Sequence, residues 1–115
     1  MSLRPVTQRI PPYRDRALLD LAHRVEECQL RLPGICRGHS PGCEPAHSNQ
    51  SQHGKGGAQK AGDNFHVAAC HWCHAELDQG NKFTRAEKAD FWRAGYDRTM
   101  ALYFRNGWIG VTGKA

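Results

Sequence analysis

Five cysteines carry the clearest chemical signal in this chain. Cys70 and Cys73 form a C-x-x-C pair, a spacing that lets two thiolates reach one metal ion with little strain. A structural zinc ion takes four ligands in a tetrahedron, so a second pair must come from Cys28, Cys36 and Cys43. A site closed by four protein ligands would be structural rather than catalytic, and it would stabilise a small fold.

The second pair of zinc ligands can be chosen in two ways. A turn at Pro33-Gly34 would bring Cys28 and Cys36 together, whereas Cys36 and Cys43 form a rival pair. A thioredoxin-like redox site would require a βαβ context, which the sequence does not show, and buried free thiols are the simplest alternative to metal binding. We predict a structural Zn²⁺ held by the four residues Cys28, Cys36, Cys70 and Cys73.

Histidines and acids near the C-x-x-C pair form a second candidate site. His74 and Asp78 are four residues apart, so on a helix they share one face and can clasp a metal ion. His47 lies upstream, and Asp63 and Asn64 precede the segment that leads to Cys70. Surface histidines and exposed helix acids are also common without any chemical role, so each of these residues must be weighed against that simpler reading.

Length and charge limit what the chain can be. It has 115 residues, a net charge of +5 and a pI of about 9.2, which fits one domain with a polyanionic partner such as nucleic acid. The mean hydropathy is -0.70, and no apolar run is long enough to cross a membrane. The N-terminus does not resemble a signal peptide, so we expect a cytoplasmic protein in which an odd number of cysteines favours metal over disulfides.

The elements that must position these residues can be predicted from periodicity and punctuation. We expect a flexible arm over residues 1–12 and one domain over residues 13–115. The expected elements are helices over 14–27 and 70–78, a helix that begins at Thr84 and ends at Asn106-Gly107, strands over 65–69 and 108–111, and loops over 37–45 and 49–63. Thr84 and Glu87 form a capping box, and Gly95 should weaken the last helix by roughly 1 kcal/mol relative to alanine.

These residues resemble a known family. The run Ala46-His47, a loop rich in glycine and lysine, Asp63-Asn64, and then Cys70-x-x-Cys73-His74-x-x-x-Asp78 is similar to the HNH (His-Me finger, ββα-metal) endonucleases. More narrowly, it resembles small HNH nucleases of lambdoid phages and prophages, and the stretch from Glu27 to Cys36 strengthens the match. The resemblance covers residues 22–79, about half of the chain.

The resemblance implies a β-hairpin, a loop and a helix around a catalytic metal. His47 would be the general base, His74 a ligand of the catalytic Mg²⁺, Mn²⁺ or Zn²⁺, and Asn64 the middle residue of the motif. Asn64 stands one residue farther from the C-x-x-C pair than the usual pattern, so Asp63 is an alternative for that place and for metal binding. Many members carry Asp or His where this chain has Ala46; Asp78, His47 or water could supply the missing ligand.

The fold class that follows is α+β, with a small zinc-pinned ββα-metal core, treble-clef-like, and flanking helices. The predicted function is metal-dependent hydrolysis of phosphodiester bonds in DNA, because a histidine base can activate water and a divalent ion can stabilise the leaving oxygen. Lys55 and Lys60 are candidate phosphate contacts. The alternatives are a zinc-structured nucleic-acid-binding protein without catalytic activity, which Ala46 favours, and a protein-interaction zinc module.

Overall fold

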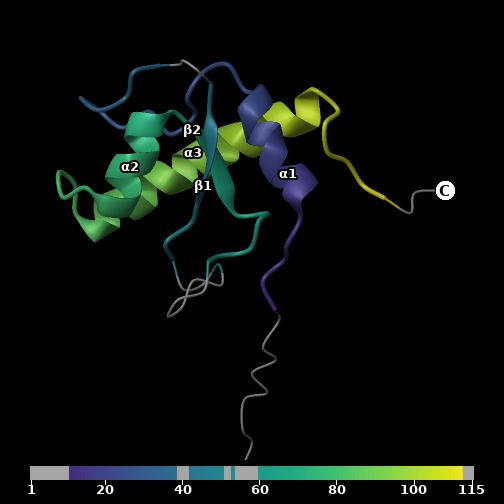
Figure 1. Ribbon diagram of the computed structural model, residues 1–115, viewed down its shortest axis with the longest axis horizontal. Helices are drawn as coiled ribbons and strands as arrows, with labels where there is room; N and C mark the ends of the chain where they lie inside the picture. The colour runs from purple at the N-terminus through teal and green to yellow at the C-terminus, as the bar shows by residue number, and fades with distance from the viewer. Residues whose placement is uncertain (1–10, 39–41, 51–52, 54–59, 113–115) are drawn as a thin grey trace, which may run out of the picture.

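The fold consists of a short antiparallel strand pair with helices on its flanks and behind it. The computed structural model describes residues 11–38, 42–50, 53 and 60–112 (Figure 1). Within these residues the elements are α1 (Arg16–Asp20), the 3-10 helix η1 (Leu21–Arg24), β1 (Glu44–His47), β2 (His66–Ala69), α2 (His71–Gln79) and α3 (Arg85–Arg105). Figure 1 shows α1 and α2 on opposite sides of the strands, with α3 crossing behind them. The predicted α+β class is confirmed.

The two strands pair in an antiparallel register that fixes the positions of Glu44 and His47 at the two ends of β1. Glu44 lies opposite Ala69, and His47 lies opposite His66. Alternate side chains of a strand point to opposite faces, so Val67 joins one core cluster while its neighbour Ala68 joins the other. The first cluster packs the strands against α2 and α3, and the second packs them against η1 and the end of α3. Four-residue strands can therefore be held on both faces.

Helix α3 is the longest element and is defined at both ends by capping motifs. The predicted capping box is confirmed: Thr84 and Glu87 exchange side-chain and backbone hydrogen bonds of 3.1 and 2.8 Å. At the other end Gly107 has φ +70°, and the N–H of Trp108 donates to the carbonyl of Tyr103 at 2.9 Å. This is a Schellman motif, which satisfies the last carbonyls of the helix.

Two sequence-based boundaries and one predicted strand were wrong. The helix expected over 14–27 is a single α-helical turn and a 3-10 turn that end at Arg24, because the chain extends at Val25 to carry the next segment toward the cysteines. The loop expected over 37–45 includes the start of β1. No strand forms over 108–111, because Trp108 turns back onto Tyr103 and lies under the guanidinium of Arg24.

The strand expected over 65–69 and the helix expected over 70–78 are confirmed as β2 and α2, within one residue at each end. The loop expected over 49–63 has no regular strand or α-helix in its described residues, and much of it lies outside them. The predicted arm over 1–12 lies almost wholly outside them too, so the domain division stays a prediction. None of the helices in the described part of the chain is long and apolar enough to cross a membrane.

Gly95 marks the closest approach between α3 and the rest of the core. A Cβ atom there would lie 2.9 Å from the backbone oxygen of Gln29 and 2.9 Å from a methyl carbon of Val67. Gln29 belongs to the cysteine-bearing turn and Val67 to β2, so Gly95 lets the helix pack against both. The glycine lowers the helix propensity of α3, but its lack of a side chain is what permits this close contact.

We expect Gly95→Ala to destabilise the protein although alanine favours helix. Overpacking costs about 1–3 kcal/mol, which exceeds the roughly 0.5–1 kcal/mol gained in helix propensity. The exposed helix position Asp90 is the matched control, since Asp90→Ala should change stability by less than about 0.5 kcal/mol. Urea unfolding of both variants measures the difference, and a stabilised Gly95→Ala protein would contradict the packing argument.

Candidate active site and cysteine cluster

Four cysteine sulfurs meet at one point. The Sγ atoms of Cys28, Cys36, Cys70 and Cys73 all lie within 4.8 Å of one another. Tetrahedral zinc with Zn–S bonds of about 2.3 Å requires sulfur separations of about 3.8 Å, so the spacing is that of a metal-binding set. Cys43 is buried elsewhere, in the cluster with Ala68 and Tyr103. Of the two pairings that the sequence left open, the structure therefore favours Cys28 with Cys36 over Cys36 with Cys43.

Local backbone turns bring the sulfurs together. The N–H of Arg31 points at Cys28 Sγ from 3.5 Å, and the N–H of Gly38 points at Cys36 Sγ from 3.3 Å. Arg31 has φ 54°, an uncommon conformation for a residue with a side chain, and Gly34 has φ 75° in the turn before Cys36. Backbone N–H groups aimed at sulfur stabilise thiolates, so the turns suit metal ligands.

The four thiols of the cluster cannot all ionise easily when no cation lies among them. Hydrogen bonds from the Cys73 thiol and from backbone N–H groups lower the pKa of Cys28 despite its burial. The same contact, in the opposite sense, raises the pKa of Cys73, because that thiol donates to the Cys28 thiolate. One thiolate therefore suppresses ionisation of its neighbour, and a divalent cation at the centre would remove the conflict.

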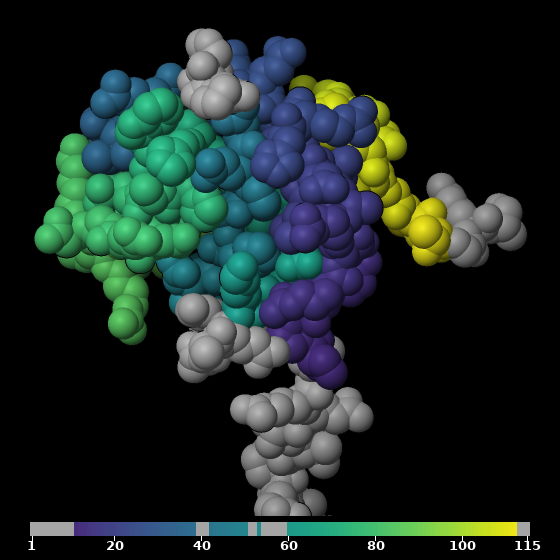
Figure 2. All heavy atoms as spheres, viewed as in Figure 1, coloured from purple at the N-terminus to yellow at the C-terminus, as the bar shows by residue number. Residues whose placement is uncertain are grey.

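A cleft of about 800 Å³ opens on the side of β1 that lies between α1 and α2. Figure 2 shows this face, with the purple surface of α1 and the green surface of α2 on either side of the blue-teal strand region. The cleft is lined by residues from α1, η1, β1, α2 and the segments after β1 and before β2: Arg16, Leu19, Asp20, His23, Glu44, Pro45, His47, Ser48, Asn49, Lys60, Ala61, His74 and Asp78.

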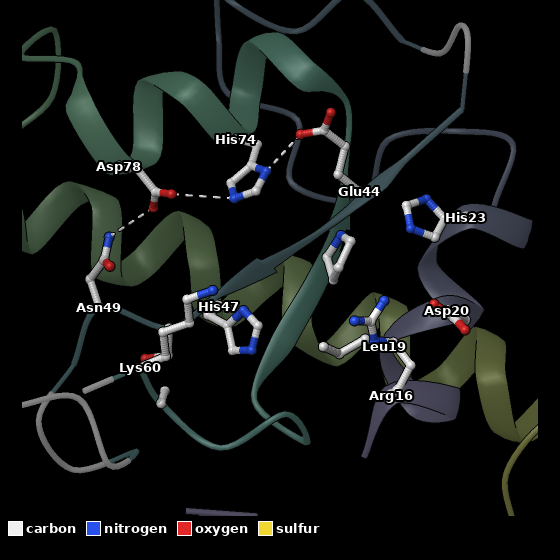
Figure 3. A pocket seen from close by; sticks show the side chains of 13 residues that line it. Arg16, Leu19, Asp20, His23, Glu44, His47, Asn49, Lys60, His74 and Asp78 are labelled. Atoms are coloured by element: carbon white, nitrogen blue, oxygen red, sulfur yellow. Dashed lines mark hydrogen bonds and ion pairs between the residues drawn. The ribbon is translucent and has the colours of Figure 1, made fainter. Parts of the chain in front are cut away.

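His74 lies in this cleft between two carboxylates (Figure 3). Its Nδ1 atom is 2.7 Å from Glu44 Oε1, and its Nε2 atom is 3.3 Å from Asp78 Oδ2. The hydrogen bond with Asp78 raises the pKa of His74, burial opposes the rise, and Glu44 adds to it. Asn49 lies 3.5 Å from the other oxygen of Asp78. An imidazole and two carboxylates supply the nitrogen and oxygen ligands that divalent cations take.

His47, at the end of β1, is held by Asp63. The distance from His47 Nε2 to Asp63 Oδ1 is 3.0 Å. The same oxygen lies 3.5 Å from the guanidinium of Arg14, and the other oxygen, Oδ2, accepts the backbone N–H of Asp15 at 2.7 Å. Burial opposes ionisation of Asp63, but the hydrogen bonds of His47 and Asp15 outweigh it, so the pKa of this carboxyl is lowered. An ionised Asp63 orients the ring of His47.

A buried pair formed by His66 of β2 and Tyr103 of α3 supports Asp63 in turn. His66 is fully buried; its Nδ1 atom lies 2.6 Å from the carbonyl oxygen of Asp63, and its Nε2 atom lies 2.9 Å from the hydroxyl of Tyr103. Burial lowers the pKa of His66, which favours the neutral ring. The neutral ring donates from Nδ1 to the carbonyl and accepts the Tyr103 hydroxyl at Nε2. Helix α3 is thereby connected to the loop that holds His47.

The structure brings together some of the predicted site residues and separates others. His47, His74, Asp78 and Lys60 all line the cleft. Within the described residues, Asp63 contacts His47 and makes no hydrogen bond or ion pair with His74, while the side-chain oxygen of Asn64 lies over Gly62. Lys55 lies outside the described residues.

Sequence reasoning missed Glu44, Arg16 and Asn49, which also line the cleft. Pro45 made the segment before His47 look like a loop. Proline is tolerated on an edge strand, so extending the strand back from His47 would have placed Glu44 beside the site.

This chain is similar to proteins of a known family. The family described as "Putative nuclease YbcO" matches residues 18–108. The chain belongs to the YbcO family. It is 33% identical over 89 residues to the "Putative nuclease YbcO" of Escherichia coli (strain K12), covering 76% of this chain and 92% of that protein. The protein of the same description from Enterobacteria phage 82 matches equally.

A solved structure shares the fold. It is titled "Structure of a putative bacteriophage protein from Escherichia coli str. K-12 substr. MG1655", with 30% identity and a TM-score of 0.56 over 76% of this chain and 98% of that chain. The YbcO match spans the four clustered cysteines, His47 and His74, whereas Arg14 and Arg16 precede it. The family supports a nuclease with a phage association, which agrees with the coarser part of the sequence-based prediction.

In this YbcO-family protein, the Tyr103 hydroxyl should be worth more than an ordinary surface hydroxyl. Tyr103→Phe leaves the buried Nε2 of His66 without its partner, which costs about 1–3 kcal/mol. Tyr96 is the control: it stacks on Trp92, and within the described residues its hydroxyl makes no hydrogen bond, so Tyr96→Phe should change stability by less than about 0.5 kcal/mol. Thermal or urea unfolding measures the loss of stability in each variant. Equal losses would show that the His66–Tyr103 hydrogen bond contributes no more than an ordinary hydroxyl.

Proposed function

We propose that this protein is a metal-dependent HNH-type endonuclease that hydrolyses phosphodiester bonds in DNA. One observation carries the proposal: His47 with its orienting carboxylate and His74 with two carboxylates line the same cleft. The order of elements supports the HNH subtype, because His47 ends β1, β2 pairs with it, and α2 follows with His74. A strand pair and a helix around a metal is the arrangement that the resemblance implies.

We assign a structural Zn²⁺ to Cys28, Cys36, Cys70 and Cys73. The four sulfurs are close enough for one ion, and backbone N–H groups point at three of them, including Cys73 Sγ from Leu32 at 3.4 Å. Cys70 precedes the first residue of α2, and Cys73 lies in its first turn. The ion would therefore join the turn over residues 28–36 to the helix that carries His74.

The zinc assignment predicts which cysteines control metal content. Cys36→Ser should lose the ion and much of the stability, because metal binding is coupled to folding in small domains. Cys36 is only half-buried, so loss of packing at this site is a small part of the effect. Cys43→Ala, in the other cluster, should keep about one zinc per chain. Metal analysis of the purified proteins measures both contents; a wild-type protein without zinc, or equal losses in both variants, would refute the assignment.

We assign the catalytic divalent metal to His74 and Asp78. The 3.3 Å between His74 Nε2 and Asp78 Oδ2 agrees with the separation of neighbouring ligands, which is about 3.0–3.4 Å for metal–ligand distances near 2.1 Å. Such a metal supplies positive charge to the phosphate and to the leaving oxygen. Ala46 cannot contribute a ligand, and its side chain is fully buried in the core cluster that contains Trp92, so it does not line the cleft.

His47 is suited to act as the general base. Asp63 accepts a hydrogen bond from Nε2–H, which leaves Nδ1 as the basic nitrogen, and within the described residues Nδ1 has no hydrogen-bond partner. This pairing of a histidine with a buried carboxylate fixes the ring and its tautomer and stabilises the imidazolium that forms when a proton is taken from water. Asp63 thus acts by orienting the base. Asn64 stays the proposed middle residue of the HNH motif, on the resemblance alone.

Two cationic side chains of the cleft are suited to contact a nucleic-acid backbone, whereas its carboxylates Asp20, Glu44 and Asp78 would require a divalent cation beside the phosphate. Arg16 from α1 and Lys60 from the segment before β2 lie along it, on a chain with a net charge of +5. Phosphate contacts of this kind supply affinity that does not depend on sequence. Lys55, the other proposed contact, lies outside the described residues and stays a prediction. DNA is favoured over RNA on the resemblance to phage and prophage nucleases.

The function is tested by plasmid cleavage with Mg²⁺, Mn²⁺ or Zn²⁺. His47→Ala should reduce the cleavage rate by about 10²–10⁴ and leave DNA binding unchanged, since removal of a general base spares the ground-state contacts. His23→Ala, which removes another histidine from the same cleft, should keep most of the activity.

Two results would contradict the proposal at different levels. If wild-type protein cleaves no DNA or RNA with any common divalent ion, the enzyme is excluded and a zinc-structured nucleic-acid-binding protein becomes the better hypothesis. If wild-type protein cleaves and His47→Ala cleaves equally well, the nuclease stands and His47 is not its base.

A further inference from the structure

Glu44 makes the shortest side-chain contact with His74, and neither the sequence motif nor the family match assigns it a role. Its Oε1 atom lies 2.7 Å from His74 Nδ1, compared with 3.3 Å between His74 Nε2 and Asp78. Its other oxygen, Oε2, lies 3.3 Å from Nδ1 of the exposed His71. The carboxylate thus contacts two histidines of the first turn of α2, and each oxygen has its own partner.

The position of Glu44 on β1 is relevant to the metal ligand that Ala46 cannot supply. Side chains two residues apart on a strand share one face, so Glu44 and Ala46 lie on the same face of β1. Ala46 packs into the core cluster with Leu77 of α2 and Trp92 of α3. Glu44 is the next residue on that face, beyond the core, and it reaches the start of α2. A carboxylate is therefore present on this face at position 44, although position 46 has none.

We infer that Glu44 is the positioning residue for the catalytic-metal ligand His74. A histidine that binds a metal through one ring nitrogen usually donates the N–H of its other nitrogen to a carboxylate or carbonyl, and this fixes the ring and its tautomer. Glu44 holds Nδ1–H, so Nε2 is the nitrogen that can give up its proton and present a lone pair to a metal. Nε2 is also the nitrogen that faces Asp78, whose second oxygen lies 3.5 Å from Asn49 (Figure 3).

This assignment rests on the proposed function, and it divides the two carboxylates beside His74 between two tasks. Asp78 is a metal ligand, with Nε2 of His74. Glu44 binds the opposite side of the ring and acts through it. Removal of such a carboxylate partner typically weakens metal affinity by about 10–100-fold, while the metal ligands themselves stay in place.

The experiment measures Mn²⁺ binding to the full-length, zinc-containing protein by calorimetry or by the EPR signal of free Mn²⁺. We expect Glu44→Ala to weaken Mn²⁺ binding by about 10–100-fold without loss of the cysteine-bound zinc. Glu44→Gln should stay close to wild type, because the amide oxygen can still accept the Nδ1–H. Asp20→Ala is the control: it removes an exposed carboxylate that lines the same cleft from α1, and Mn²⁺ affinity should change little.

A spectroscopic signature separates positioning from a general loss of negative charge. With Mg²⁺ bound, long-range ¹H–¹⁵N NMR spectra of wild type and Glu44→Gln should show His74 protonated at Nδ1. Glu44→Ala should show a mixture of tautomers.

The outcomes distinguish the inference from the proposed function. If wild type binds Mn²⁺ and cleaves DNA but Glu44→Ala binds Mn²⁺ equally well, the role of Glu44 is refuted and the nuclease stands. If Glu44→Gln and Glu44→Ala lose affinity equally, Glu44 is a direct ligand and the positioning role is refuted. If wild type neither binds Mn²⁺ nor cleaves, the proposed function and this inference both fail.

Discussion

The meeting of four cysteine sulfurs is the constraint on which the rest of the structure depends. Cys28 and Cys36 belong to a turn without regular secondary structure, while Cys70 and Cys73 stand at the junction of β2 and α2. The cluster joins this turn to elements that are themselves short, two four-residue strands and a nine-residue helix. A small chain buries a limited apolar area, so a metal at this point would supply stability that the core lacks.

Helix α3 supports the same junction from behind. Arg98 binds the carbonyl of Gln29 in the cysteine turn at 3.0 Å, and Trp92 donates to the carbonyl of Ala46 in β1 at 3.1 Å. Gly95 allows the close approach that both contacts need, and Tyr103 reaches His66 at the far end. One helix thus contacts the cysteine turn and both strands, so the positions of His47 and His74 depend on residues distant from the cleft.

The cleft itself pairs each candidate histidine with carboxylates in a different way. In the part of the chain that the structure describes, the ring of His47 pairs with one nearly buried carboxylate, Asp63, which is held by Arg14 and by a backbone N–H. His74 has a carboxylate at each ring nitrogen. The first arrangement suits a general base, because one ring nitrogen is left without a carboxylate partner and can accept a proton. The second suits a metal ligand, because one carboxylate fixes the ring while the other nitrogen faces a cation. Two histidines in one cleft can therefore take different roles because their neighbours differ.

Spacing along the chain was sufficient for the features that depend on neighbours in sequence. The C-x-x-C pair, the capping box at Thr84 and Glu87, and the shared helix face of His74 and Asp78 are all local, and all appear as expected. The pairing of His47 with Asp63 and the contact of Glu44 with His74 join residues 16 and 30 positions apart. The exclusion of Cys43 from the cysteine cluster likewise depends on the tertiary fold, which buries it in the other core cluster. Such contacts depend on strand register and on how α2 and α3 pack, and periodicity carries no information about either.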